Sequence, residues 1–212
     1  MHTHKLARPQ TYQPRLETFA KASEWHINAG MVKAKSLYAV AKARQLRTLQ
    51  AQLEEYRHRI EELFTSHPDS GLFGSLTGAG PKLAPRLLSE VGSDRALYDD
   101  SQSLQCVAGT APVSFQSGKI KKAHIRRGCN RSLRHTMHLF AQRSTEQCAW
   151  AKIYYDTLRE KGKSHAQALR CLGQRWIKII WKMWQTRTDY NAELHLKNQT
   201  AHGSWVLQIK PA

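Results

Sequence analysis

The sequence predicts a mainly α-helical protein, in which a long N-terminal coiled coil or helical hairpin precedes a compact helical domain. Apolar residues recur at helical spacings over most of the chain, and the stretch 15–66 has no proline and a single glycine. Hydrophobic residues make up 41% of the 212 residues and include six tryptophans, which is enough for a real core. We expect the compact domain to contain a helix-hairpin-helix element and one short extended or hairpin segment.

The first helices carry a heptad pattern. Residues 1–14 contain two prolines and are expected to form a flexible lead-in. Within the predicted coiled-coil segment 15–66, Gly30 is the expected break between two helices. Such a segment either dimerises the chain or closes an antiparallel hairpin within it, and both remain open. Its a/d seam has spacings of three and four residues and consists of Leu46, Leu49, Leu53, Tyr56, Ile60 and Leu63.

A boundary rich in glycine and proline, at 67–81, separates these helices from a second domain predicted over 67–190. Within it, the spacing of Gly78 and Gly80 fits a helix-hairpin-helix element. Its two glycines permit a tight turn, whose backbone N–H groups can meet a phosphate at the start of the next helix. On this interpretation Gly78, Gly80 and Lys82 bind the nucleic-acid backbone without reading sequence. A plain turn that caps the following helix explains the same residues.

Further helices are expected along the second domain. A short helix over 98–109 precedes an extended or hairpin segment over 110–128. Asn130 is a suitable N-cap for the next helix, Thr145 is the expected cap of another, and Ser164 caps a final helix with a wide apolar stripe. Residues 191–212 form a tail in which no strong pattern is visible.

The charge is strongly positive and unevenly distributed. Lys and Arg number 33 against 16 acidic residues, which gives a net charge of +17. A ribosomal or membrane-surface protein would show the same total, but the distribution is more specific. No acidic residue occurs in 101–145, and a one-sign run of this length favours contact with phosphates over an ordinary solvated face. That run contains Lys119, Lys121, Lys122, Arg126, Arg127, Arg131, Arg134 and Arg143.

Neither a signal peptide nor an apolar run of about 18 residues is visible. The four cysteines are far apart and form no C-x-x-C pair. This pattern fits a reduced cytosol better than a disulfide framework.

Metal chemistry is not favoured. His135 and His138, with Cys129 ahead of them, can in principle ligate zinc, but a fourth ligand is missing and phosphate-facing imidazoles explain the pair equally well. Metal-dependent phosphoryl transfer needs converging carboxylates, and the one tight acidic cluster is interpreted as a solvated helix end. That cluster consists of Glu90, Asp94, Asp99 and Asp100. No metal site is therefore predicted in this chain.

A nucleophilic hydroxyl is the remaining candidate. Ser117 precedes Gly118 in a Gln-Ser-Gly-Lys sequence, with a cluster of cations behind it. Breaking and rejoining DNA through a serine ester requires an exposed hydroxyl, a backbone that admits phosphate, and positive charge at the pentacovalent centre. An ordinary basic turn would have the same residues.

In order and spacing, a set of motifs over 76–190 resembles the C-terminal transposase domain of the insertion-sequence class named after elements 110, 116 and 902. The helices before residue 67 look like the coiled-coil linker of that family. No single motif is specific, but the series is. It runs through 77–81 (TGAGP), 87–92 (LLSEVG), 107–112 (VAGTAP), 117–119 (SGK), 126–134 (RRGCNRSLR), 154–163 and the Trp-rich final helix.

The resemblance implies that 67–190 is a DNA-binding and serine-recombination domain with Ser117 as its nucleophile. Ser114 is a minor rival, because 112–117 is less polar than the family's usual sequence. The resemblance also implies that the basic segment holds DNA or a structured guide RNA, and that the chain forms a homodimer or homotetramer through its coiled coil. A cytoplasmic, nucleoid-associated protein is expected.

Family members also carry an N-terminal RuvC-like nuclease domain with four acids, which this sequence does not show. The expectation is a truncated copy in which Mg²⁺ would enter only with that domain, so no cofactor is expected here. The alternative is a catalytically inactive remnant that acts as a dimeric nucleic-acid-binding protein.

Overall fold

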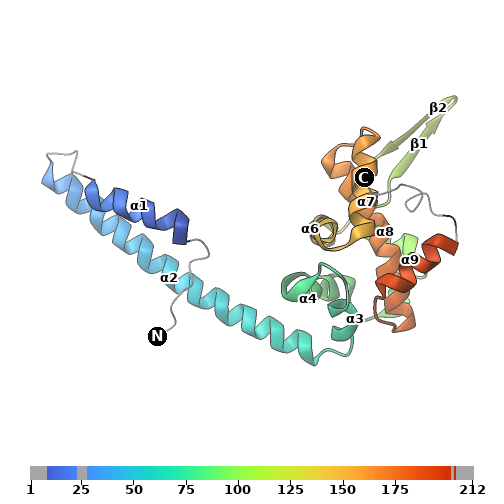
Figure 1. Ribbon diagram of the computed structural model, residues 1–212, viewed down its shortest axis with the longest axis horizontal. Helices are drawn as coiled ribbons and strands as arrows, with labels where there is room; N and C mark the ends of the chain where they lie inside the picture. Colours follow the sequence, from blue (N-terminus) through green and yellow to red (C-terminus); the bar gives the residue numbers. More distant parts are fainter. Residues whose placement is uncertain (1–8, 23–27, 202, 204–212) are drawn as a thin grey trace. The chain divides into compact units, whose positions relative to one another are not determined.

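The computed structural model describes residues 9–22, 28–201 and 203, and it confirms a mainly α-helical fold. The chain divides into two compact units, Met1–Tyr56 and Arg57–Ala212. Its elements in order are α1 (Pro9–Lys21), α2 (Ala29–Ser66), α3 (Ser70–Gly74), α4 (Gly80–Val91), the 3-10 turn η1 (Arg95–Leu97), α5 (Ser101–Val107), β1 (Val113–Ser117), β2 (Ile120–His124), α6 (Arg131–Gln147), α7 (Ala149–Glu160), α8 (His165–Thr186) and α9 (Ala192–Ala201) (Figure 1).

The N-terminal helices differ from the expectation at two points. The predicted lead-in is wrong for 9–14, since α1 begins at Pro9 and contains Pro14. Pro9 starts the helix, where its missing N–H has no helical partner in any case, whereas Pro14 lies inside the helix and removes one backbone hydrogen bond. Gly30 is not a break, because α2 begins at Ala29 and the Asn28 side chain accepts from the Gly30 and Met31 N–H groups. Residues 1–8 and most of the link between the helices lie outside the described residues.

The heptad seam lies along α2, which runs without interruption for 38 residues. All six seam side chains are exposed, with exposed fractions from 51% at Ile60 to 67% at Tyr56. The described part of this chain therefore leaves the apolar seam open to solvent.

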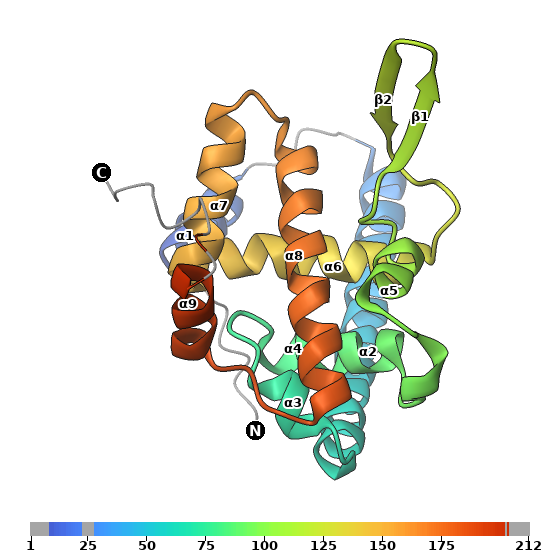
Figure 2. The same ribbon diagram turned by 90° about the vertical axis from the view of Figure 1, so that its right-hand side faces the viewer.

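Helix α8 is the centre of the second unit, and it packs against α5, α6 and α7. Figure 2 shows it crossing α6. Trp176, in the middle of α8, is fully buried between Phe140 and Trp150, at ring-centroid distances of 4.9 and 4.8 Å. Its indole Nε1 donates to the Ser144 hydroxyl at 2.8 Å, which satisfies a buried polar group inside the core.

The caps of α6 and α8 are confirmed. Asn130 accepts hydrogen bonds from the first turn of α6, and Ser164 forms a reciprocal capping box with Gln167. The cap expected at Thr145 is wrong, because α6 continues to Gln147 and α7 follows Cys148. The Thr145 hydroxyl donates back to the Gln142 carbonyl, so it is satisfied within the helix and does not end it.

The segment after α5 contains an antiparallel hairpin, which confirms the extended or hairpin expectation. Ser117 pairs with Ile120, so Gly118 and Lys119 form a two-residue turn. Gly118 has φ +53°, the left-handed conformation that such a tight turn requires and glycine accepts without strain. The hairpin projects away from the helices of its unit (Figures 1 and 2).

The C-terminal segment has more order than the sequence indicated. Helix α9 forms over Ala192–Ala201, with the Asn191 side chain accepting from the Leu194 N–H. Tyr190, just before it, binds the body of the domain, because its hydroxyl accepts from the Trp150 Nε1 at 2.9 Å. Among the helices of the described residues, none combines the length and apolarity needed to cross a membrane.

Candidate nucleic-acid interface

Ser117 ends β1 at the tip of the hairpin and is exposed. Because side chains alternate along a strand, Ser117 shares a face with Phe115 and with Lys122, the residue across from Phe115. Ser114 lies on the opposite face and nearer the base. The two candidate serines therefore present their hydroxyls in different directions, and only Ser117 adjoins the glycine turn.

The whole of β1 is exposed, including its apolar side chains. Phe115 is 53% exposed and contacts the His124 ring edge-on, with centroids 6.2 Å apart. Within the described part of the chain, the Ser117 hydroxyl makes no side-chain hydrogen bond. An exposed hydroxyl beside cations is present, but the group that would remove its proton is not among its neighbours here.

The cations predicted along 119–134 fall into two places. Lys119 and Lys122 lie on the hairpin and are exposed. Lys121 is in β2, but its side chain is outside the described residues. Four arginines lie at the base of the hairpin and at the start of α6. The first and the last of them are in contact, because the Arg134 guanidinium is 3.5 Å from the Arg126 carbonyl. The four are Arg126, Arg127, Arg131 and Arg134.

Two adjoining pockets lie at this base. One, of about 230 Å³, is lined by residues that include His124, Arg126 and Lys163. The other, of about 420 Å³, is lined by residues that include Arg131 and Arg134. They share Thr110, Ile125 and Arg170, and no acidic side chain lines either of them. We call the two together the basic groove.

The glycine turn is not part of the basic groove. Gly78 is buried with φ +94°, and a Cβ there would lie 3.2 Å from the Ser144 backbone. Residues 131 and 144 are 13 positions apart on α6, or about 20 Å along a helix. Gly80 and Lys82 are exposed at the start of α4, and Lys82 lines a separate, mostly apolar pocket. The residues predicted to contact the nucleic-acid backbone therefore form two separate clusters. Close packing against α6 explains why position 78 is a glycine.

Three of the four acids in the acidic cluster, Glu90, Asp94 and Asp100, cap or brace neighbouring elements. Glu90 accepts from the Asn130 side chain at 3.2 Å and from the Ser132 hydroxyl, which ties α4 to the start of α6. Asp94 caps η1, and Asp100 caps α5 through Ser103, whose backbone N–H lowers the pKa of that carboxyl. Among the described residues no three His, Cys, Asp or Glu converge as metal ligands. These acids do not fit a bound Mg²⁺, and no step of the chemistry is assigned to one.

Sequence reasoning missed the α8 side of the basic groove. Arg170 lines both pockets and Lys163 lines one, yet they follow Arg134 by 36 and 29 positions and sit outside the acid-free run. His138 lines the larger pocket, and burial is the main cause that lowers its pKa, followed by the nearby charges of His165, His135 and Arg170. Only the packing of α6 on α8 brings these groups together.

The hairpin, the glycine turn and most of α6 and α7 lie in a segment that matches a known family. Residues 70–156 match the family described as Transposase IS116/IS110/IS902. Through this segment the chain belongs to that transposase family.

Relatives agree with this assignment. The protein of insertion element IS110 from Streptomyces coelicolor is 35% identical over 162 residues, 76% of this chain and 38% of its own length. A protein of the same organism named as a transposase of the IS117 mini-circle is 30% identical over 154 residues, 73% of this chain and 37% of its own length. A protein of element IS900 from Mycobacterium paratuberculosis is 31% identical over 150 residues, 70% of this chain and 38% of its own length. The chain thus spans less than two fifths of the length of these relatives.

Proposed function

We propose that this chain is the DNA-binding and strand-exchange part of an insertion-sequence transposase, with Ser117 as the nucleophile. The observation that carries the proposal is the position of this serine, exposed at the tip of a cationic hairpin within the segment that matches the family. A projecting hairpin can enter a groove of DNA or a neighbouring active site, which a serine in the core cannot do.

In the proposed reaction, the Ser117 oxygen attacks a phosphorus atom of the DNA backbone and loses its proton to a base. The bond from phosphorus to one deoxyribose oxygen breaks, and that oxygen leaves as a protonated hydroxyl. A hydroxyl of a second strand then attacks the serine–phosphate ester, which joins the strands and restores the serine. Lys119 and Lys122 flank Ser117 along the hairpin and offset the negative charge on the pentacovalent centre.

The four arginines predicted between 126 and 134 are assigned to the nucleic-acid backbone. Arg126, Arg127, Arg131 and Arg134 lie at the base of the hairpin, where a strand bound at the tip would continue. Their guanidinium groups suit bidentate contacts with phosphate. Contacts of this kind position a strand and leave its sequence to be read elsewhere, so DNA and a structured guide RNA both suit the groove.

The exposed seam supports assembly through α2. Six large apolar side chains at a/d spacing are open to solvent along one helix, and pairing with a second copy would bury them. The chain is therefore proposed to act as a homo-oligomer. The base that activates Ser117, and any metal-dependent step, are assigned to residues outside the described part of this chain.

Trapping a covalent protein–DNA adduct tests the proposal. The chain is incubated with DNA carrying an element end, with the nuclease domain of a full-length relative supplied in trans, and adducts are separated under denaturing conditions. Wild type and Ser114→Ala are expected to form the adduct, whereas Ser117→Ala is not. If Ser117→Ala forms as much adduct as wild type, the assignment of the nucleophile is wrong.

A second candidate function is a non-enzymatic one, in which the chain is an oligomeric nucleic-acid-binding protein. The Ser117 hydroxyl without a neighbouring base favours it. Both functions predict binding to DNA, so binding alone does not separate them. Salt-sensitive binding with no adduct from wild type, in a reaction where the full-length relative forms one, would establish the second.

A further inference from the structure

The larger pocket of the basic groove has an apolar floor and a cationic rim. It lies where the first half of α6 packs against the first half of α8, and Ile125, just after β2, reaches it. Met137 and Leu169 in its lining are 1% exposed and so belong to the core. The polar part of the lining consists of Thr110, Arg131, Arg134, His135, His138 and Arg170.

The positive charge of the three arginines on the rim, Arg131, Arg134 and Arg170, is not balanced by acidic side chains of the described residues. None of the three guanidinium groups forms an ion pair with a carboxylate in the described part of the chain. Among the described residues, the Arg134 guanidinium hydrogen-bonds only to the Arg126 carbonyl, 3.5 Å away, and Arg134 and Arg170 are both half-buried. Bringing cations together and partly desolvating them without a counter-charge is unfavourable. An anion seated among them would remove that cost, and a phosphate oxygen pair matches the geometry of arginine.

The pocket offers more than an anion requires. Its volume of about 420 Å³ falls in the range of roughly 300–1,000 Å³ typical of small-ligand sites. Two imidazole rings stand at its wall, and such rings stack on unpaired bases. The His138 ring is fixed by an edge contact with His165 at 6.2 Å, and the Tyr155 hydroxyl bonds the His165 Nδ1 at 2.7 Å. These contacts orient the His138 part of the wall.

We propose that this pocket binds one unpaired nucleotide of the nucleic-acid substrate, with its phosphate on Arg131, Arg134 and Arg170 and its base on the apolar floor beside His135 and His138. The inference rests on the proposed nucleic-acid function, but it assigns a site distinct from Ser117. A strand lying along the hairpin would turn one nucleotide out of the stack into the pocket, which fixes the register of the strand.

The experiment is calorimetric titration of the whole chain with a deoxynucleoside monophosphate, the parent deoxynucleoside and inorganic phosphate. The monophosphate is expected to bind at least about tenfold more tightly than either fragment, since one charged hydrogen bond contributes about that factor. Ala166→Phe, which fills the pocket from an exposed position on α8, and Arg170→Gln should each weaken binding by about tenfold or more. Thermal melts establish that both variants fold.

Arg175→Gln is the matched control. It removes the same charge from the same helix, but Arg175 does not line the pocket and lies 5.7 Å from the Tyr154 ring instead. Equal binding of inorganic phosphate, an equal loss in Arg175→Gln, or unchanged binding in Ala166→Phe would each overturn the nucleotide site. If the covalent adduct at Ser117 still forms in the face of such a result, the nucleotide site has failed while the proposed function stands.

Discussion

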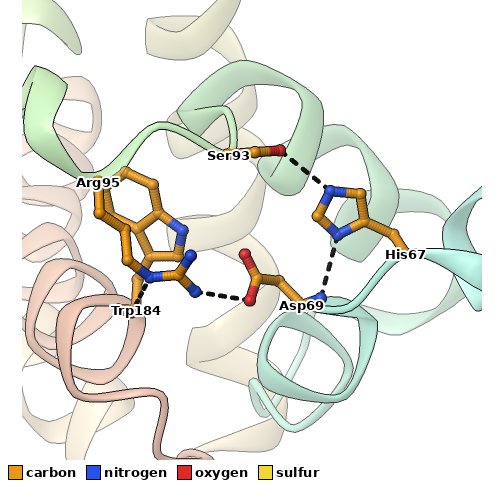
Figure 3. A network of polar contacts seen from close by, with 5 residues as sticks. All are labelled: His67, Asp69, Ser93, Arg95 and Trp184. Atoms are coloured by element: carbon orange, nitrogen blue, oxygen red, sulfur yellow. Dashed lines mark hydrogen bonds and ion pairs between the residues drawn. The ribbon is translucent and has the colours of Figure 1, made fainter.

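The Arg95 guanidinium donates to the Asp69 carboxylate across 2.6 Å while it lies over the Trp184 indole, 5.3 Å from the ring centre (Figure 3). Its Nε also donates to the Trp184 carbonyl at 2.8 Å. The Asp69 side chain is 8% exposed and that of Arg95 is 21% exposed. This pair therefore connects the start of α3, the turn η1 and the end of α8.

We expect Asp69→Ala and Arg95→Ala to lower the free energy of unfolding by about 3 kcal/mol each, because each leaves a largely buried charge without its partner. The double variant should lose much less than the sum of the two. Urea denaturation of the four proteins in this cycle measures the coupling. Additive losses would show that the pair contributes little as a pair.

The same cluster has the residue types of a hydrolytic triad but not its hydrogen bonding. The His67 Nδ1 accepts from the Asp69 backbone N–H at 3.0 Å, so a neutral ring carries its proton on Nε2. That Nε2 lies 3.0 Å from the Ser93 hydroxyl and donates to it (Figure 3). A donating imidazole cannot remove the serine proton. Ser93→Ala is accordingly expected to leave adduct formation at Ser117 unchanged when adducts are separated under denaturing conditions. Loss of the adduct would implicate this cluster in the chemistry.

The two glycines of the turn should differ in their effect on stability. Gly78→Ala combines a left-handed backbone with a Cβ 3.2 Å from the Ser144 backbone, so we expect a loss of about 3 kcal/mol. Gly80→Ala has φ +57° but meets nothing within 4 Å, and a loss of about 1 kcal/mol is expected. Thermal unfolding of both variants provides the comparison. Equal losses would mean that the approach to α6 does not explain Gly78.

Local signals in the sequence predicted the helical class, the hairpin segment and two of three helix caps. Asn130 and Ser164 were found because a cap is determined by neighbours one turn away. The α8 half of the basic groove was missed, since Arg170 meets Arg134 only after α6 has packed on α8. The burial of Gly78 was missed for the same reason: its partner, Ser144, is 66 positions away.

His138 should make the fold sensitive to acid. The pKa of His138 is lowered from 6.5, first by burial and then by the charges of His165, His135 and Arg170. Arg131 and Arg134 line the same pocket as His138. The Tyr155 hydroxyl bonds His165 and does not contact the His138 ring directly. Below pH 6.5 the unfolded chain takes up the proton first, so stability falls as the pH drops towards the lowered folded-state pKa. Above this pH range His138 is neutral in both the folded and the unfolded chain, so it adds no pH dependence to the stability.

Melting temperatures of wild type and His138→Gln between about pH 7 and pH 5 test this. The wild type should lose more stability than the variant over that range. His195, whose pKa burial also lowers, should leave a residual fall in both proteins. Parallel curves for the two proteins would contradict the role of His138.

The hairpin lysines should account for part of the salt dependence of DNA binding. Each phosphate contact adds about 0.9 to the slope of log affinity against log salt on duplex DNA. Lys119→Gln and Lys122→Gln are each expected to reduce the slope by about that amount. Lys152→Gln is the control, because Lys152 already pairs with Asp156 at 2.8 Å. Fluorescence anisotropy over a salt series measures the slope, and an unchanged slope in both hairpin variants would remove these lysines from the interface.

The seam of α2 should determine the oligomeric state. Leu53 occupies a seam position and is 52% exposed in the single chain, so in an oligomer its side chain would be buried against a second copy. Leu53→Glu would place a charge in that apolar contact and should convert the oligomer to a monomer. Ala51→Glu introduces the same charge on the face opposite the seam and should leave the oligomer intact. Light scattering after size-exclusion chromatography gives the mass of each protein. The seam does not determine the oligomeric state if the wild type is monomeric at all concentrations. The same conclusion follows if the Ala51→Glu protein dissociates as readily as Leu53→Glu.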